Sequence, residues 1–313
     1  MFDFHVHAWI PDFIPMPIRM SWAEGAAYRK EPARDPAAIL PRVTLSVSDP
    51  EGQNLLKAMD VAGIDSAAIM AVDYAIGAGE EAPVSLPKVL EHYARICAQS
   101  EGRLFFFASV DPRRENGIAL AKDSLLNRGA LGLKIYPPSG FRSGDPICFP
   151  LYDLLRETRK IAVVHTSPVP GRLSSYCAWP VHISDALANY QDVPFVLAHS
   201  GYPCWWDEAV ALASIHSRTY LELSLWDRVA PSDWEAFAGK LAAARDVVGA
   251  DRILFASDTM FGSNYLPEAL RLKRWTDGFR KLGEGPNAKF SAQEVELMIE
   301  GNARRLIAYA QGR

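Results

Sequence analysis

Residues 130–165, ALGLKIYPPSGFRSGDPICFPLYDLLRETRKIAVVH, contain the pattern that decides the fold. Two short apolar runs, Ala130–Tyr136 and Ile161–His165, enclose Leu151–Thr158, where apolar residues recur at three- and four-residue intervals. Short uninterrupted apolar runs are typical of buried strands. Apolar residues at three- and four-residue intervals are typical of a helix that packs on one face. The segment therefore predicts a strand, a helix and a second strand parallel to the first.

The same alternation extends over most of the chain. Further strands are predicted at Phe2–His7, Ile64–Val72, Leu104–Val110, Pro194–His199, Thr219–Ser224 and Arg252–Asp258. Further helices are predicted at Gly52–Ala62, Leu86–Gln99, Glu115–Asn127, Trp206–His216 and Ser232–Val248. Eight strands that alternate with helices predict an α/β fold, the (β/α)8 or TIM barrel. A doubly wound open sheet is disfavoured because no GxGxxG turn follows the first strand.

Composition limits the function classes. The 313 residues are 49% hydrophobic and 22% charged, which is ordinary for a globular protein. The formal net charge of −4 gives no basic excess for nucleic acid or an anionic membrane surface, and no long apolar run predicts a transmembrane helix. Four scattered cysteines without a CxxC pair and the lack of a signal-peptide pattern favour a cytoplasmic protein with reduced thiols. We expect a small-molecule substrate.

Two segments interrupt the regular spacing. Residues 8–50 are rich in prolines and large aromatic residues and follow the first strand, so in a barrel they lie over the active-site face. They form either a surface excursion that packs on itself or a pocket wall or lid. Residues 137–149, after the fourth strand, leave the same alternatives open. Residues 290–311 predict a helical tail at the C-terminus.

Two histidines lie in the first predicted strand. His5 and His7 are two residues apart, so their side chains face one side, opposite to Phe2, Phe4 and Val6. In a barrel the phenylalanine side would pack on the helices and the histidine side would line the interior. Two histidines in a core are costly unless something binds them, and a metal ion is a natural partner.

Other polar residues end the predicted strands at regular intervals. Lys134 precedes His165 by 31 residues, and His165 precedes His199 by 34. Each interval matches one strand–helix unit, since about 250 residues over eight units give roughly 31. Asp258 follows His199 by 59 residues, close to two units. These residues fall at the carboxyl ends of strands, where the active sites of barrel enzymes lie. Because their spacing fits a single set of eight strand–helix units, we expect one barrel domain over residues 1–313.

Together these motifs resemble those of a known group of enzymes. FDFHVHA, LGLKIYPP, VVHTS, VLAHSGYP and LFASDTM, in this order, resemble the amidohydrolase superfamily of metal-dependent barrel enzymes. GNARRL in the tail resembles the ending of its amidohydrolase-related (amidohydrolase 2) branch, which contains aminocarboxymuconate-semialdehyde and resorcylate decarboxylases. The resemblance covers nearly the whole chain. It implies a site for a divalent metal, expected to be zinc, formed by His5, His7, Lys134, His165, His199 and Asp258.

The resemblance leaves open whether the site holds one metal ion or two. The chemical state of Lys134 distinguishes the two cases. In binuclear members the fourth-strand lysine is carboxylated and bridges two metals, and His165 and His199 would hold the second one. In the mononuclear branch one ion is bound by His5, His7, His165 and Asp258. His199 then serves as an acid–base or polarising group, and Lys134 is a free ammonium that binds a substrate carboxylate or joins an ion pair.

Hydrolysis is the expected reaction. A bound divalent ion lowers the pKa of a water molecule to about 7, and the resulting hydroxide attacks an ester, lactone or amide carbonyl. Asp258 accepts the proton and passes it to the leaving group. The alternative is a metal-dependent, non-oxidative decarboxylase of an aromatic or unsaturated carboxylic acid. A second alternative, from another class, is a catalytically inactive barrel that serves as a binding protein.

Residues on the loops after the strands are candidates for substrate binding. Tyr136, Arg142 and Arg172 suit an anionic or hydroxylated substrate, and Trp205 and Trp206 suit a hydrophobic wall. Glu222 and Ser224 share one face of strand seven, where they either support the residues of the site from behind or, as the default role, pack within the barrel. Dimers are common among such barrels, so a homodimer is an expectation by analogy.

Overall fold

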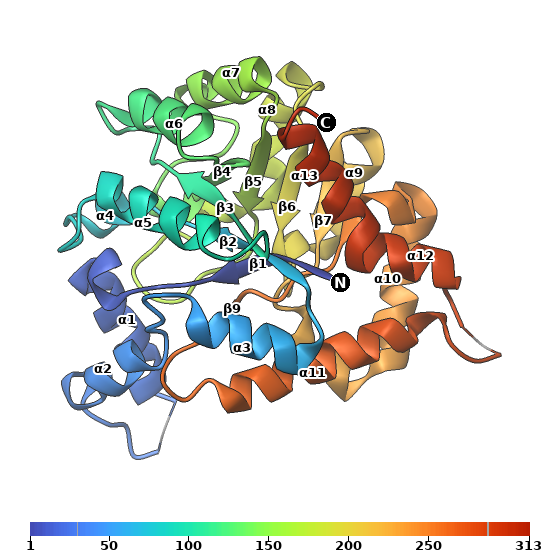
Figure 1. The fold of residues 1–313 in the computed structure, drawn as a ribbon, viewed down its shortest axis with the longest axis horizontal. Helices are drawn as coiled ribbons and strands as arrows, with labels where there is room; N and C mark the ends of the chain where they lie inside the picture. The colour runs from blue at the N-terminus through green and yellow to red at the C-terminus, as the bar shows by residue number, and fades with distance from the viewer. Residues whose placement is uncertain (30, 287) are drawn as a thin grey trace.

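A barrel of parallel strands surrounded by helices forms the centre of the computed structural model, which describes residues 1–29, 31–286 and 288–313 (Figure 1). The strands are β1 (Phe2–His7), β2 (Ser66–Met70), β3 (Leu104–Ser109), β4 (Gly132–Ile135), β5 (Ile161–His165), β6 (Phe195–Ala198), β7 (Thr219–Glu222), β8 (Ile253–Leu254) and β9 (Thr259–Met260). They pair in the order β8-β7-β6-β5-β4-β3-β2-β1-β9. Because β8 and β9 belong to one segment that pairs with both β7 and β1, the ring closes, and the predicted (β/α)8 fold is confirmed.

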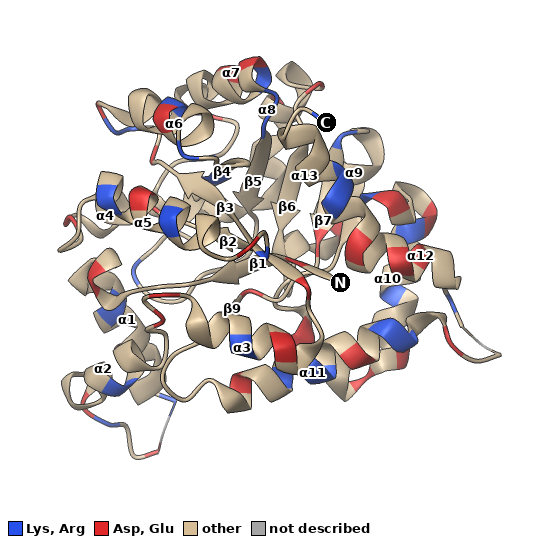
Figure 2. Ribbon diagram, viewed as in Figure 1, with Lys and Arg blue, Asp and Glu red and all other residues tan. Residues whose placement is uncertain are grey.

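Helices connect successive strands around the outside of the barrel. They are α3 (Gln53–Ala62), α4 (Ala75–Ala78), α5 (Leu86–Ala98), α6 (Gly117–Leu126), α7 (Phe149–Thr158), α8 (Ser184–Asn189), α9 (Trp206–Ile215) and α10 (Trp234–Val248). After β9, α11 (Leu266–Arg280) lies beside α3. Each predicted helix begins and ends within two residues of an observed one. Charged residues lie mainly along these helices and the loops, whereas the strands carry few (Figure 2).

The eighth strand differs from its prediction. We expected a continuous strand over Arg252–Asp258, but the structure divides this region into β8 and β9. The division occurs because Asp258 has a φ of 56°, in the left-handed region, which an extended strand does not allow. Tertiary hydrogen bonds hold the intervening backbone, since Trp275 Nε1 donates to the carbonyl of Ala256 at 3.0 Å.

The prediction that Phe2 and Phe4 pack on the outer helices is wrong. Both belong to a buried cluster drawn from the strands and from the C-terminal helix, with Met70, Phe107 and Val163 among its members. The pairing of β1 with β2 shifts register between Asp3 and Val6. This irregularity lets Phe2 and Phe4 fill the barrel interior, while the two histidines of β1 line the cavity above them.

Residues 8–50 fold over the carboxyl end of the barrel. Outside the undescribed position 30, they contain the helices α1 (Met16–Ala27) and α2 (Pro36–Leu45), which pack on each other. The ends of the insertion are tied together, because the amide of Asp49 donates to the carbonyl of Trp9 at 2.9 Å. Trp9, Ile14 and Ile18 form a buried cluster with Tyr74, which follows β2. The insertion is therefore anchored to the barrel.

The C-terminal segment is helical, as expected for residues 290–311. It comprises α12 (Ala292–Glu296), a π-helical turn (Leu297–Gly301) and α13 (Asn302–Ala310). Leu306 and Ile307 of α13 join the cluster inside the barrel, so α13 closes the end opposite to the insertion. The buried amide of Asn302 donates to the carbonyls of Ala250 and Ile253, each at 2.7 Å. These bonds join α13 to the start of β8.

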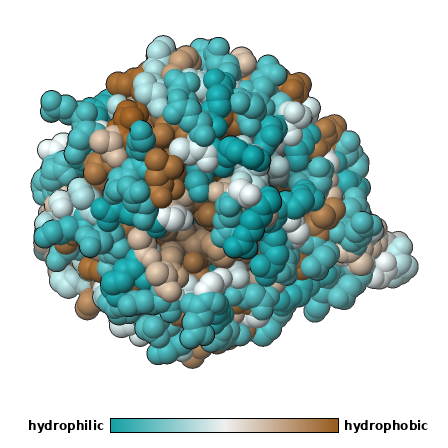
Figure 3. Space-filling view, turned by 45° about the horizontal axis from the view of Figure 1, so that its top comes forward, coloured by the Kyte–Doolittle hydropathy of each residue, from teal (hydrophilic) through white to brown (hydrophobic). Residues whose placement is uncertain are grey.

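One face of the molecule is mainly polar. The face shown in Figure 3 is predominantly hydrophilic, and its hydrophobic residues lie scattered among polar ones. Among the helices of the described ranges, none has both the length and the apolar composition needed to cross a membrane.

Replacement of Asn302 tests the attachment of α13. Asn302→Ala leaves two buried carbonyls without their donor, so the free energy of unfolding should fall by about 1–3 kcal/mol. Urea unfolding followed by circular dichroism measures the change. Asn127→Ala, which removes an exposed amide bonded to Asp123, is the control and should change stability by less than about 0.5 kcal/mol. Equal stability of the two variants would contradict this account of the tail.

Candidate metal centre

Six residues predicted for the metal site meet at the carboxyl end of the barrel. They line one cavity of about 550 Å³: His5, His7, Lys134, His165, His199 and Asp258. The parallel register places them at one level, because His165 pairs with Ala198 and His7 pairs with Met260. His199 follows β6 in a 3-10 turn (His199–Gly201), and Asp258 lies between β8 and β9.

A carboxylate and two imidazoles form the centre of this cluster. Asp258 Oδ1 lies 3.0 Å from His7 Nε2 and 3.4 Å from His5 Nε2. His5, His199 and Asp258 each offer a ligand atom, and these atoms lie within 4.8 Å of one another. Nitrogen and carboxylate oxygen atoms at such separations are a donor set that suits a divalent metal ion.

Two of the histidines are held by main-chain carbonyls. His7 Nδ1 donates to the carbonyl of Met70 at 2.9 Å, and His165 Nε2 donates to the carbonyl of Ser167 at 2.8 Å. Because a carbonyl only accepts, these nitrogens carry the proton, and the other nitrogen of each neutral ring presents a lone pair. The free nitrogen of His7 faces Asp258 Oδ1, and that of His165 faces His199 Nε2 at 3.0 Å.

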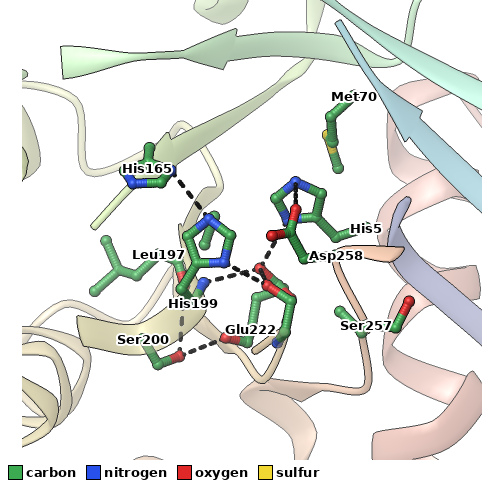
Figure 4. A network of polar contacts seen from close by, with 12 residues as sticks. His5, Met70, His165, Leu197, His199, Ser200, Glu222, Ser257 and Asp258 are labelled. Atoms are coloured by element: carbon green, nitrogen blue, oxygen red, sulfur yellow. Dashed lines mark hydrogen bonds and ion pairs between the residues drawn. The ribbon is translucent and has the colours of Figure 1, made fainter. Parts of the chain in front are cut away.

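Glu222, at the end of β7, orients the other two histidines (Figure 4). Its Oε2 lies 3.2 Å from His5 Nδ1 and accepts from Ser224 Oγ at 2.9 Å. Since the Ser224 proton is used in that bond, its oxygen accepts from His199 Nδ1 at 2.6 Å. The Nε2 atoms of His5 and His199 therefore present lone pairs to the cavity. Strand alternation predicts the shared face of Glu222 and Ser224 but does not identify their hydrogen-bond partners.

The protonation states suit a metal site. Burial lowers the pKa of His5, His165 and His199, and the charge of Lys134 lowers each of them further. These rings are therefore neutral at neutral pH, as metal ligands must be. Burial alone would raise the pKa of Asp258, but the hydrogen bond with His7 and the positive charge of the histidines when they are protonated hold it well below its ordinary value. The carboxylate is thus ionised. When the rings are neutral it faces nitrogen lone pairs, and a cation between them would relieve the repulsion.

Lys134 lies beside these groups on the barrel floor. Its Nζ is 3.3 Å from His5 Nε2, and its side chain is almost completely buried. Burial lowers the pKa of Lys134 to about 8, although the charges of Glu222 and Asp258 oppose this shift. The amine therefore carries its proton at neutral pH and donates to His5.

The backbone at two of these residues is strained. His199 has a φ of 69° and Asp258 a φ of 56°, both in the left-handed region that residues other than glycine seldom occupy. Such conformations cost free energy and persist only where the surroundings hold them. The amide of Asp258 donates to the carbonyl of His5 at 2.8 Å, and the amide of His199 donates to Glu222 at 2.9 Å.

Aromatic side chains form much of the cavity wall. Trp9 and Trp22, both from the insertion, stack with ring centroids 5.0 Å apart, and Trp9 also lies 4.4 Å from the ring of His7. Tyr136, a predicted substrate residue, lines the cavity and meets Tyr74 edge to face at 5.3 Å. The sequence motifs did not indicate Tyr74 as a cavity residue, although its position directly after the second strand is a usable signal.

Four predicted substrate residues are absent from the described lining of the cavity: Arg142, Arg172, Trp205 and Trp206. Arg142 turns toward Asp145 in its own loop, and Arg172 pairs with Glu24 on the outside of α1 at 3.2 Å. Trp206 begins α9 and packs on Trp226 with ring centroids 4.8 Å apart, while Trp205 lies at the start of the same helix. Position on the correct loop did not determine the direction of these side chains.

The fold and the converging side chains define a TIM-barrel protein with a candidate metal centre. The family model described as "Amidohydrolase" matches residues 2–308, and the chain belongs to this family. A comparison with curated protein sequences found no match.

Solved structures share the fold at low sequence identity. An uncharacterised TIM-barrel protein from Bordetella bronchiseptica is 18% identical, with a TM-score of 0.67 and full coverage of both chains. A 5-carboxyvanillate decarboxylase from Novosphingobium aromaticivorans, complexed with manganese and 4-hydroxy-3-methoxy-5-nitrobenzoic acid, is 15% identical, with a TM-score of 0.64 and 98% and 95% coverage. An amidohydrolase from Burkholderia multivorans with bound HEPES is 18% identical, with a TM-score of 0.58 and 98% coverage of each chain.

The orientation of the histidines by Glu222 can be tested directly. Glu222→Gln replaces one of the two acceptor oxygens with an amide nitrogen, which cannot accept from His5 or Ser224. The affinity of the site for a divalent metal ion, measured with zinc, should therefore fall about 10- to 100-fold. Competition with a chromophoric chelator measures the affinity. Glu81→Gln, at an exposed carboxylate paired with Arg114, is the control.

A second variant tests the same orientation if Glu222→Gln does not fold. Ser224→Ala removes the hydroxyl that links Glu222 to His199, leaves the contact of Glu222 with His5 in place, and should also weaken zinc binding. Wild-type zinc affinity in folded forms of both variants would show that these residues do not orient the site.

Proposed function

We propose that this protein is a metal-dependent hydrolase that cleaves an ester, lactone or amide bond of a small organic substrate. The observation that carries the proposal is the convergence of Asp258 Oδ1 with imidazole nitrogens whose lone pairs face the cavity. Within the described chain, the protein supplies no proton donor between His165 Nδ1 and His199 Nε2, which fits a site made for a cation. We propose that residues 1–313 act as one barrel domain.

His5, His199 and Asp258 would hold the ion, and the free nitrogens of His7 and His165 are further donors in the same cavity. A divalent ion in this position supplies Lewis acidity, which activates water as a nucleophile and polarises a carbonyl. We propose zinc, because imidazole and carboxylate donors suit it. We propose one ion per chain, since the Lys134 ammonium beside His5 disfavours a second cation.

The chain's own residues would perform the remaining chemistry. Asp258 is ionised and can accept a proton from the attacking water and deliver it to the leaving group. Lys134 offers a positive charge to a developing or existing anionic group on the substrate. Trp9 and Trp22 cover part of the cavity and exclude bulk water, which strengthens these electrostatic interactions.

Non-oxidative decarboxylation of an aromatic or unsaturated carboxylic acid is a second candidate. Its specific support is the protonated Lys134 on the cavity floor, which suits a substrate carboxylate. The structural similarity to a decarboxylase bound to a ring carboxylic acid agrees with this candidate at the level of fold.

Removal of the proposed ligands tests the function. A panel of 4-nitrophenyl acetate, dihydrocoumarin and 4-nitroacetanilide should include a substrate for the zinc-loaded protein. Hydrolysis should stop after chelation and return with zinc. His5→Ala and Asp258→Asn should lower turnover by at least about 100-fold because they remove a ligand and the proton carrier. His216→Ala, at the end of α9, is the control, and metal content is measured for each protein.

Wild-type metal content and turnover in both His5→Ala and Asp258→Asn would refute the metal-dependent mechanism. Carbon dioxide release from 2,6-dihydroxybenzoate without hydrolysis of any panel compound would instead favour the decarboxylase.

A further inference from the structure

Two buried tryptophans donate to main-chain carbonyls beside the two strained residues of the candidate metal centre. Trp226, which begins the 3-10 turn after β7 (Trp226–Arg228), donates from Nε1 to the carbonyl of His199 at 3.0 Å. Trp275 of α11 donates from Nε1 to the carbonyl of Ala256 at 3.0 Å, two residues before Asp258. The two tryptophans are 4% and 0% exposed, so water does not compete for these bonds.

The backbone that carries His199 turns sharply. Three consecutive residues, His199, Ser200 and Gly201, have φ values of 69°, 45° and 72°, all in the left-handed region. Such a run costs free energy in residues other than glycine, so neighbouring groups must hold it. The carbonyl of His199 accepts from the Trp226 indole and from the amide of Tyr202, the latter at 2.9 Å. The indole therefore supplies one of the two hydrogen bonds to this carbonyl.

The backbone that leads to Asp258 lies in the gap between β8 and β9. Ala256 is completely buried there, so its carbonyl needs a donor, and Trp275 supplies one. Asp258 follows with its φ of 56°. The Trp275 indole thus holds the segment from which the left-handed turn at Asp258 starts.

The two tryptophans belong to one aromatic cluster, formed by Trp206, Trp226, Trp234, Phe237 and Trp275. Phe237 of α10 contacts both, with ring centroids 6.2 Å from Trp226 and 5.5 Å from Trp275. Trp206 meets Trp226 at 4.8 Å, and Trp234 stacks on Trp275 at 5.5 Å. Closely packed rings have few alternative positions, so this cluster fixes both indole donors.

We propose that Trp226 and Trp275 are positioning residues of the metal centre. Through the main chain they hold His199 and Asp258 in the strained conformations that bring the ligand atoms of these residues toward one ion. Those atoms lie within 4.8 Å of each other and of a ligand atom of His5. The inference rests on the metal-binding part of the proposed function and not on the bond that is cleaved.

Replacement by phenylalanine separates the hydrogen bond from the packing. Trp226→Phe and Trp275→Phe each remove the N–H donor and keep an aromatic ring. In the zinc-free protein, hydrogen exchange at the amide of His199 and of Asp258, respectively, should become about 10-fold faster relative to amides of β3, across the barrel. Nuclear magnetic resonance measures the exchange. Either variant alone suffices for the test if the other does not fold.

The bound metal reports the ligand positions. Trp226→Phe and Trp275→Phe should each raise the Kd for zinc about 10-fold, measured by competition with a chelator. They should also change the visible absorption of the cobalt-substituted protein, which depends on coordination geometry. Trp206→Phe and Trp234→Phe are matched controls from the same cluster, because neither indole nitrogen donates a hydrogen bond to any described residue. The controls should keep the wild-type Kd and spectrum.

The two readouts distinguish this inference from the proposed function. Equal amide exchange, zinc Kd and cobalt spectrum in all four variants would overturn the inference and leave the metal centre standing. Faster exchange confined to Trp226→Phe and Trp275→Phe, in a protein whose wild type binds no zinc, would support the role of the indoles in holding the two segments and refute the metal-dependent function.

Discussion

The buried carboxylate of Glu222 imposes the constraint on which the candidate centre depends. It binds the Nδ1 side of His5 directly and that of His199 through Ser224, so both rings must present Nε2 to the cavity. Main-chain carbonyls accept from one ring nitrogen of His7 and of His165, so the other nitrogen of each ring also presents its lone pair to the cavity. Four lone pairs and the Asp258 carboxylate then converge without a protein cation among them except Lys134. Such an arrangement is electrostatically unfavourable until a metal ion is bound.

The floor of the site could be predicted from the sequence because two regular features determine it. Strand alternation gives the shared face of His5 and His7, and one strand–helix unit separates Lys134, His165 and His199. The register of β1 and the break before β9 could not be predicted. Both lie next to tertiary hydrogen bonds of Asp3, whose carboxylate accepts from the amides of residues 5 and 257 and joins segments far apart in the chain. Alternation alone therefore placed Phe2 and Phe4 on the wrong face.

The rim of the cavity was less predictable, because loops and an irregular insertion form it. Proline-rich residues 8–50 have no periodic pattern that would show which side chains turn inward, so the sequence did not show that Trp9 and Trp22 line the cavity. Arg142 and Arg172 lie on the expected loops but pair with nearby acids instead. The predictable and the unpredictable parts of the site thus differ in structure. The strands form the floor of the cavity, which suits metal chemistry, and the insertion and loops form the surface that would select the substrate.

Anomalous diffraction from crystals of the zinc-loaded protein tests the central claim most directly. The account predicts one anomalous peak in the barrel cavity, in contact with His5 Nε2, His199 Nε2 and Asp258 Oδ1. It also predicts an unmodified Lys134 beside that peak. A zinc-loaded crystal with no peak in the cavity, or with zinc bound only elsewhere, would contradict the account.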